Sequence, residues 1–220
     1  MQESGPFSVI QGMEARSKAK KILATFPPDV REYFNKLDRR CQKHGITLLL
    51  GSGKALYSDG RCGGYFCNHI KVLAVAIGGE IGDVLGCAIH EESHLSQALN
   101  PRSIWHKKGI LTGHSRFFKY LSGERIYKPR QAVLATISLE ADCERRTLRA
   151  LKKWQKYVNL KLAARRANSY ILCHYKMLET GKWPKKSPYN KKILAHCPDT
   201  LVRSNSKPSW RLKMAFDRYL

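Results

Sequence analysis

The sequence predicts an α+β protein, with a small antiparallel or mixed sheet near its start and a helix-rich C-terminal half. Short apolar runs that contain β-branched residues alternate with Gly-rich turns over residues 46–77, a pattern typical of strands. Beyond residue 84, apolar residues recur every three or four positions over long stretches, which indicates helices. The order of the two patterns favours a sheet followed by a mainly helical core.

The first half of the chain begins with a segment that lacks a regular pattern. Residues 1–28 end in the pair Pro27-Pro28 and are expected to form a loose leader. Residues 30–43 carry apolar side chains at helical spacing, and Asp29 is a suitable N-cap for that helix. Within the sheet region, strands are expected at 46–50, 64–67 and 70–76.

Beyond the sheet region the sequence predicts three long helices. They span residues 84–99, 131–158 and 160–178. Asp83 can cap the first of these helices, and Asn100-Pro101 end it. A charged insertion at 101–130 separates the first two helices, and the chain closes with a basic tail at 201–220.

Positive charge is concentrated in the second half of the chain. The 220 residues include 40 Lys and Arg and 17 Asp and Glu, which gives a formal net charge of +23. Residues 1–100 hold 12 basic and 10 acidic residues, whereas residues 101–220 hold 28 and 7. This excess favours a polyanionic partner, DNA or RNA, for the second half. A solvated basic surface would give the same composition.

The cysteines and the apolar segments indicate a cytoplasmic protein that does not enter a membrane. The seven cysteines are an odd number, and residues 1–21 lack the apolar core of a signal peptide, so the thiols are expected to be reduced. The longest apolar stretch, residues 72–89, is interrupted by Glu80 and Asp83. A stretch with two carboxylates inside it is not expected to span a bilayer.

One motif carries the strongest indication of chemistry. His90-Glu91-Glu92-Ser93-His94 fits the pattern H-E-x-x-H. In a helix His90 and His94 lie one turn apart on one face, where both imidazoles can bind one zinc ion. Glu91 stands beside them and can act as general base on a water activated by zinc. The alternative is a pair of core histidines that are satisfied by hydrogen bonds.

A catalytic zinc needs a third protein ligand. One class of H-E-x-x-H enzymes takes a histidine six residues after the second, but this position is Asn100. The helix at 131–158 offers Glu140 and Glu144, which lie about 40° apart on its apolar stripe. Glu140 is the preferred ligand, and Glu144 either orients a ligand histidine or replaces Glu140. Asp142 lies on the opposite, basic side, so its removal is expected to do little.

Other combinations of reactive side chains are less regular. Buried salt bridges would also account for the two glutamates. Two sets are candidate structural metal sites: Cys62, Cys67 and His69, and the dipeptides Cys173-His174 and His196-Cys197. Cys143 is a candidate nucleophile beside His90 or His94. The candidates for donating a hydrogen bond to the transition state are Tyr65, His106, His114 and Tyr170. If neither glutamate binds zinc, His106 or His114 is the next choice of ligand.

Residues 84–97, followed by Glu140-Ala141-Asp142, resemble the gluzincin-type zinc peptidases, including the ImmA/IrrE-like group. Over about residues 60–200 the chain is similar to a group of uncharacterised bacteriophage metallopeptidases, on four motifs: His90-Glu-x-x-His94-x-x-Gln97, Leu139-Glu140-x-Asp142-Cys143-Glu144-x-Arg146, Ala167-Asn168-Ser169-Tyr170 and Lys182-Trp183. The basic excess after residue 100 and the tail after Thr200 depart from that group. The resemblance implies a zincin-like metallopeptidase domain at 29–200, which in a phage-encoded protein acts in the host cytoplasm.

The expected function is zinc-dependent hydrolysis of peptide bonds in a peptide or protein substrate. Zinc held by His90, His94 and Glu140 would activate a water, and Glu91 would pass the proton of that water to the leaving amine. The strand at 70–76 is expected to form the edge along which an extended peptide pairs. A rival hypothesis is a nucleic-acid-binding protein with a structural or vestigial zinc site. A third hypothesis is a protease that its basic half directs to proteins bound to nucleic acid.

Overall fold

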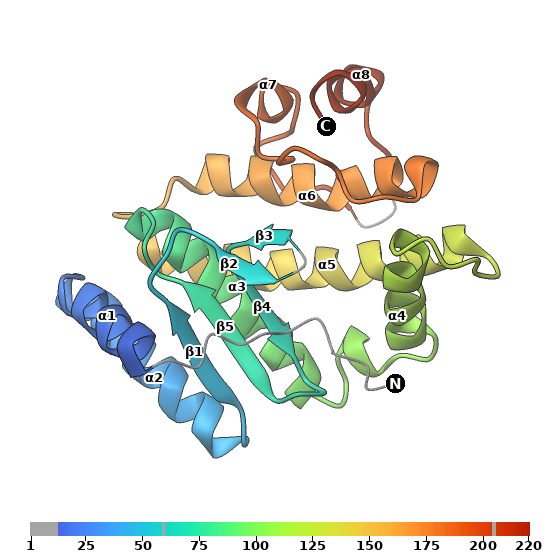
Figure 1. Ribbon diagram of the computed structural model, residues 1–220. Helices are drawn as coiled ribbons and strands as arrows, with labels where there is room; N and C mark the ends of the chain where they lie inside the picture. The colour runs from blue at the N-terminus through green and yellow to red at the C-terminus, as the bar shows by residue number, and fades with distance from the viewer. Residues whose placement is uncertain (1–12, 59, 204–205) are drawn as a thin grey trace. The chain divides into compact units, whose positions relative to one another are not determined.

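The computed structural model describes residues 13–58, 60–203 and 206–220. It confirms the α+β class, because the five strands that it describes precede residue 77 and helices dominate the chain beyond that point (Figure 1). The chain divides into two compact units, and the zincin-like domain expected at 29–200 stays a prediction. Unit 1 extends to Ser96 and includes Lys156–Val158, and unit 2 comprises Gln97–Gln155 and Asn159–Leu220.

A three-stranded mixed sheet is the centre of unit 1. Its strand order is β1-β5-β4: β5 (Val72–Ala76) pairs in parallel with β1 (Thr47–Gly51) and antiparallel with β4 (Gly64–Cys67). All five residues of β5 are buried, as is typical of a strand with neighbours on both sides. The expectation that residues 70–76 form the sheet edge is therefore wrong, and β4 lies at that edge. A separate antiparallel pair, β2 (Leu56–Ser58) and β3 (Gly60–Cys62), completes the strands.

Three helices belong wholly or mainly to unit 1. They are α1 (Met13–Ala24), α2 (Pro28–Lys43) and α3 (Ile81–Leu99). Both α1 and α2 contact β1, and α2 buries Val30, Phe34, Leu37 and Cys41 at helical spacing. The segment expected to be a loose leader therefore contains α1, although residues 1–12 lie outside the described residues.

The starts of α2 and α3 differ from the expected ones by two or three residues. Pro27 is the N-cap of α2 and Pro28 occupies the first turn, where the lack of a backbone N–H costs nothing. Asp29 is therefore not the cap, and its carboxylate binds Lys156 and Tyr157 at 2.9 Å each. In α3, Asp83 likewise lies in the first turn.

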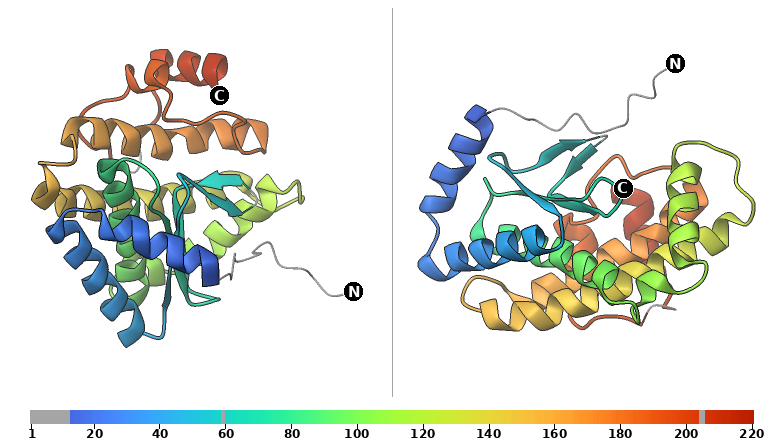
Figure 2. Two further views of the ribbon diagram at one scale, coloured as in Figure 1. Left: turned by 60° about the vertical axis from the view of Figure 1, so that its left-hand side comes forward. Right: turned by 90° about the horizontal axis from the view of Figure 1, so that it is seen from below.

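Unit 2 consists of helices stacked in layers. Its α-helices are α4 (Ile110–Leu121), α5 (Pro129–Leu151), α6 (Leu160–Thr180), α7 (Lys191–Leu194) and α8 (Trp210–Tyr219), with 3-10 turns η1 (Ile104–His106) and η2 (Lys152–Trp154). α6 lies between α5 on one side and α7 with α8 on the other (Figures 1 and 2), and α4 packs on α5. The predicted helix at 131–158 gives way to η2 after Leu151. The predicted helix at 160–178 extends to Thr180, where Gly181 ends it at φ 66°.

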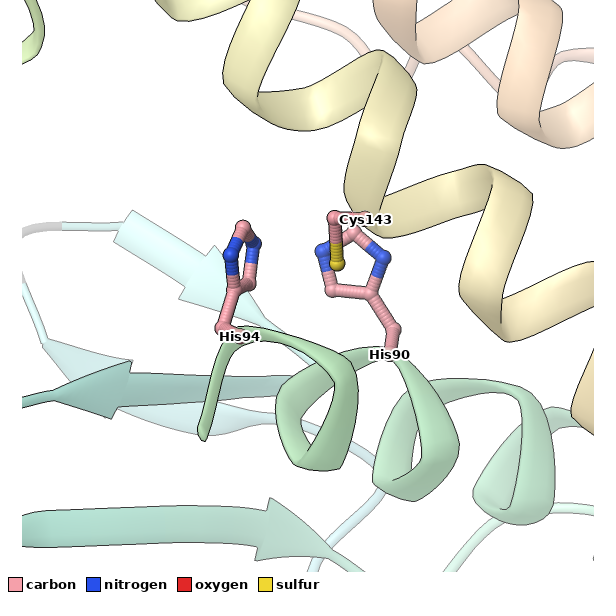
Figure 3. Close-up of side chains that lie close together, drawn as sticks. All are labelled: His90, His94 and Cys143. Carbon is pink, nitrogen blue, oxygen red and sulfur yellow. The ribbon is translucent and has the colours of Figure 1, made fainter. Parts of the chain in front are cut away.

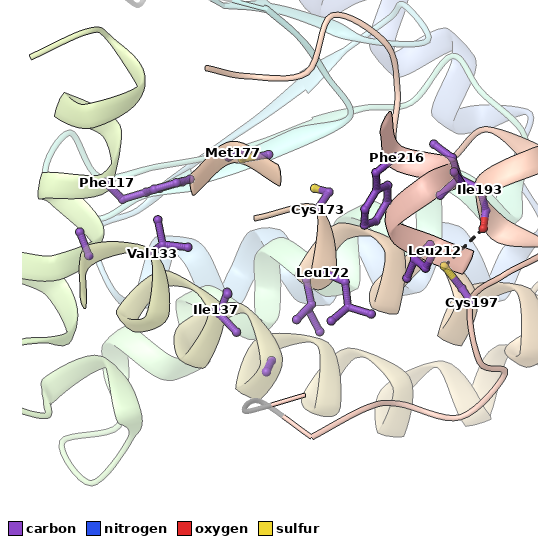
Figure 4. Close-up of a cluster of buried hydrophobic side chains, with 14 residues drawn as sticks. Phe117, Val133, Ile137, Leu172, Cys173, Met177, Ile193, Cys197, Leu212 and Phe216 are labelled. Carbon is purple, nitrogen blue, oxygen red and sulfur yellow. Dashed lines mark hydrogen bonds between the residues drawn. The ribbon is translucent and has the colours of Figure 1, made fainter. Parts of the chain in front are cut away.

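The core of unit 2 draws on all five of its α-helices and on Cys197, just after α7. Figure 4 shows this cluster. It includes Phe117 of α4, Ile137 of α5, Cys173 of α6, Phe216 of α8, and Cys197 from the segment after α7. Leu212 and Phe216 are almost fully buried there. The basic tail expected at 201–220 therefore ends in a helix that closes the core. Among the described residues, no helix is both long enough and apolar enough to cross a membrane.

The turn after β5 lies close to the segment after β1. The N–H of Gly78 donates to the carbonyl of Gly53 at 2.9 Å. A Cβ on Gly78 would lie 2.3 Å from the carbonyl oxygen of Ser52 and 2.8 Å from the carbonyl carbon of Gly53. A Cβ on the neighbouring Gly79 would meet nothing closer than a Val84 methyl at 3.8 Å. A substitution at Gly79 is therefore a suitable control for the same substitution at Gly78.

We expect Gly78→Ala to lower the free energy of unfolding by about 1–3 kcal/mol, because the added methyl group displaces backbone that cannot yield cheaply. Gly79→Ala is the control and should change stability little. Urea unfolding followed by circular dichroism measures both values. Equal stability of the two variants would show that the backbone contact at Gly78 is not tight.

Candidate metal centre

An ion pair in unit 1 fixes the rotation of α3 about its axis. Arg40 of α2 donates to Glu92 Oε1 at 2.6 Å, and the Tyr33 hydroxyl donates to Glu92 Oε2 at 3.0 Å. Burial and the charge of Glu92 raise the pKa of Tyr33 well above its usual value, so the phenol keeps the proton that it donates. Glu92 lies about 200° from His90 around the helix. The side of α3 that bears the histidines is thus opposite the side held by α2.

The two histidines of the motif lie side by side on α3. Their ring centroids are 4.8 Å apart, and the ring planes are inclined at 84°. His94 is 8% exposed and His90 is half-buried. Figure 3 shows both imidazoles on one side of the helix. The predicted proximity of His90 and His94 is confirmed, and it follows from the four-residue spacing.

Glu91 is buried against the edge strand of the sheet. Its side chain is 6% exposed, and a Cβ on Gly64 of β4 would lie 3.1 Å from Glu91 Cγ. The same Cβ would lie 2.6 Å from the Ala74 carbonyl oxygen and 2.7 Å from Cys87 Sγ. Glycine at position 64 therefore allows β4 to approach both its neighbour strand and the carboxylate of the motif.

His90, His94 and Cys143 form a group that could hold a metal ion (Figure 3). Each offers one ligand atom, two imidazole nitrogens and a thiol sulfur, and these atoms lie within 4.8 Å of one another. Cys143 of α5 is fully buried. Imidazole and thiolate are ligands that zinc accepts. From the sequence Cys143 was considered only as a nucleophile, although its place next to Glu144 and three residues after Glu140 was the available signal.

Glu140 and Glu144 both lie on the buried side of α5, as predicted. The group of three does not include them. Glu140 lies close enough to α6 for its charge to act on two groups there. Burial raises the pKa of the Cys173 thiol, and the nearby Cys197 and Glu140 add to that rise. Burial lowers the pKa of His174, and the charge of Glu140 opposes that change.

A buried glutamine connects the last turn of α3 to α5 within unit 2. Gln97 lies on the same face of α3 as His90 and His94, about 20° from His90, and is 0% exposed. Its side-chain amide donates to the Leu139 carbonyl at 3.1 Å and to Asp142 Oδ2 at 2.9 Å. In the sequence Gln97 was noted only as the last residue of a motif similar to one of the phage metallopeptidases, so the role of Gln97 in packing was missed.

Asp142 is the acceptor for several donors. Arg146 and Arg145 bind it at 2.8 and 3.0 Å, in addition to Gln97. Burial by itself would raise the pKa of Asp142, but the hydrogen bonds from Gln97 and Arg146 and the charges of both arginines lower it overall. Asp142 does lie among basic residues, and the expectation that its removal does little to zinc binding stays a prediction. Its contact to a fully buried amide gives it a structural role that the sequence did not indicate.

The remaining candidates lie elsewhere. His106 Nε2 is 2.8 Å from the Ala98 carbonyl oxygen, and His114 Nδ1 is 3.3 Å from Thr136 Oγ1. Two sets were suggested as structural metal sites, Cys62 with Cys67 and His69, and Cys173-His174 with His196-Cys197. Neither set forms a metal-binding group of three in the described part of the chain. Cys173 and Cys197 do lie in the same core cluster. Tyr65 lies on β4 beside Gly64, and Tyr170 packs edge-on against His174.

No protein-family model matches the chain, and neither a curated protein nor a solved structure matches it. The site is therefore interpreted from its own residues.

We expect Asp142→Ala to lower the free energy of unfolding at pH 7 by about 1–3 kcal/mol, because the buried Gln97 amide loses a charged acceptor. Asp199→Ala is the control. It removes an exposed carboxylate that is 3.7 Å from Arg165, and such pairs contribute little.

The loss of unfolding free energy in Asp142→Ala, called its stability deficit, should become smaller as the pH falls. The folded pKa of Asp142 lies below its unfolded value of about 4, so its contribution is present above pH 4 and is lost as the pH falls. Urea unfolding at pH 7 and pH 3 should give the larger deficit at pH 7. A deficit that grows in acid would contradict the lowered pKa.

Proposed function

We propose that this protein is a zinc-dependent hydrolase of peptide bonds, with His90 and His94 as zinc ligands and Glu91 as general acid and base. The supporting observation is the pair of adjacent imidazoles on α3 with a buried carboxylate between them in the sequence. The burial of Glu91, which is 6% exposed, places its carboxylate in surroundings where a nearby dication would interact with it strongly.

The donor set fits zinc. His90, His94 and Cys143 would supply two nitrogens and one sulfur, and three protein ligands are the number that catalytic zinc sites use. The sequence favours Glu140 as the third ligand. The experiment described below decides between Cys143 and Glu140. A bound zinc ion would polarise the scissile carbonyl and lower the pKa of water.

Glu91 performs the proton transfers in this proposal. Its carboxylate takes a proton from the attacking water and gives it to the nitrogen of the leaving amine, which prevents the expulsion of an amide anion. The neighbouring Glu92 is held by Arg40 and Tyr33 and is thereby committed to packing. Only one of the two adjacent carboxylates is therefore assigned to catalysis.

The substrate is inferred to lie along β4. This strand forms one edge of the sheet, and its Gly64 adjoins Glu91. An extended peptide that adds to the sheet at this edge would bring a backbone carbonyl close to the carboxylate. Tyr65 is the candidate donor to the developing oxyanion, because burial, and next the neighbouring thiols Cys62 and Cys67, raise its pKa and keep it protonated.

We expect one zinc ion per chain in protein purified without chelators, and loss of tight binding in His90→Ala and His94→Ala. Elemental analysis measures the zinc. Loading with Co²⁺ identifies the third ligand. Cys143 is the ligand if a thiolate-to-metal charge-transfer band disappears in Cys143→Ser and persists in Glu140→Gln. Glu140 is the ligand if only Glu140→Gln loses the metal. Protein that takes up no metal would refute the proposed function.

We expect Glu91→Gln to lower the rate of peptide cleavage by about 10²- to 10⁴-fold, the usual contribution of a general base, with zinc content unchanged. Glu92→Gln is the matched control, since it makes the same substitution one residue away and should keep most of the activity. The assay is mass spectrometry of a mixed peptide library. Equal cleavage by Glu91→Gln and the wild type would remove Glu91 from the mechanism.

A further inference from the structure

An open hollow of about 350 Å³ lies on the surface of α8, in the strongly basic half of the chain. It is lined by His196, Trp210, Arg211, Met214, Ala215, Arg218 and Tyr219. This hollow, with Lys192 beside it, is called the α8 surface below. It belongs to unit 2 alone and does not involve the residues of the metal centre.

The outer side of α8 exposes apolar groups that a packed helix normally hides. Trp210 is 68% exposed and Met214 is 61% exposed. The inner side of the same helix, Leu212, Ala215 and Phe216, is buried in the core of unit 2. The apolar face of α8 is therefore already in use, and the exposed tryptophan is not needed to hold the helix in place. Exposed Trp210 and Met214 that line the same hollow form a contiguous apolar patch, and such a patch is typical of a binding surface.

Cations lie over two rings of the α8 surface, the exposed Trp210 and the half-buried Tyr219. The Arg211 guanidinium carbon is 5.4 Å from the centre of the Trp210 ring. The Arg218 guanidinium and the Lys192 ammonium lie 5.5 and 5.1 Å from the centre of the Tyr219 ring. These contacts position aromatic faces and positive charges within one small area.

The acidic side chains near α8 do not cancel this charge. Asp217 is bound by Lys176, and Glu179 is bound by Lys213 at 3.0 Å. In the described part of the chain, no carboxylate forms an ion pair with Arg211, Arg218 or Lys192. These three cations therefore remain available to an anionic ligand.

We propose that the α8 surface binds single-stranded nucleic acid. Bases stack on Trp210 and Tyr219, and phosphates pair with Arg211, Arg218 and Lys192. Stacking requires base faces that are open, as in single strands, whereas a duplex hides them between neighbouring pairs. A membrane is disfavoured because an interfacial helix inserts its apolar side, and that side of α8 faces the protein core.

The test is fluorescence anisotropy with a labelled 15-nucleotide oligothymidine and a duplex of equal length. We expect the wild type to prefer the single strand. Trp210→Ala should weaken binding by about 5- to 140-fold, the loss of one stacked base, and Trp210→Phe should restore most of it. Tyr127→Ala is the matched control, because Tyr127 is an exposed ring with Lys128 over it at 4.8 Å but lies outside the hollow.

The salt dependence tests the cations. Arg211→Ala combined with Arg218→Ala should reduce the slope of log affinity against log salt by about 1.4, from ~0.7 per phosphate on a single strand. The control removes two exposed charges elsewhere, in Lys152→Ala combined with Lys153→Ala, and should leave more of the slope intact. Glu91→Gln should bind as the wild type does, which separates this surface from the proposed hydrolase.

Three results would overturn the proposal. The first is equal affinity for the single strand and the duplex. The second is a loss of binding in the Tyr127 or Lys152/Lys153 controls as large as in the α8 variants, since charge alone would then explain it. The third is no binding to the oligonucleotide together with binding to vesicles that contain phosphatidylserine. Circular dichroism and thermal melting of each variant check that the loss of affinity is not a loss of fold.

Discussion

The burial of polar side chains along α3 is the constraint on which the candidate site depends. An unmet polar group inside a protein costs about 1–3 kcal/mol, so a helix that buries several of them can adopt only a rotation that satisfies each one. In unit 1, Glu92 is satisfied by Arg40 and Tyr33. In unit 2, Gln97 at the end of the same helix is satisfied by Leu139 and Asp142.

The histidines take their position from these neighbours. His90 and His94 form no part of either contact, yet a rigid helix that is held at Glu92 and at Gln97 fixes the direction of the side chains along it. The chemistry of the site thus relies on residues that have no chemical role. An arrangement of this kind supplies the support that a functional constellation requires to stay within a fraction of an ångström.

Local patterns predicted the elements well, and long-range contacts explain the failures. The periodicity located β1, β4, β5 and the long helices, because each pattern depends only on the chain within one element. The edge and central positions in the sheet depend on pairing between distant segments, and the continuous apolar run of β5 was the signal that it would be enclosed. The helix α8 was missed because its basic residues obscured Leu212, Ala215 and Phe216 at positions i, i+3 and i+4.

In the candidate site, too, local spacing was predicted from the sequence and long-range contacts were not. The spacing of His90 and His94 within one turn determined their proximity, whereas the third ligand depends on how α5 packs. A helical wheel separates the buried side from the exposed side, but it does not say which neighbour each direction meets. Glu140 thus acts electrostatically on α6, Asp142 meets Gln97, and the wheel angle of Cys143 alone did not indicate a ligand.

The buried thiols give each unit its own reporter of opening. Burial raises the pKa of Cys41 in α2 to about 11, and that of Cys197 in the core of unit 2 to about 11. Alkylating reagents attack the thiolate, so each cysteine is protected both by its neighbours and by its proton. Labelling rates at these two positions would follow the transient opening of the two units separately. The native chain thus already contains probes that show whether its units unfold together or one at a time.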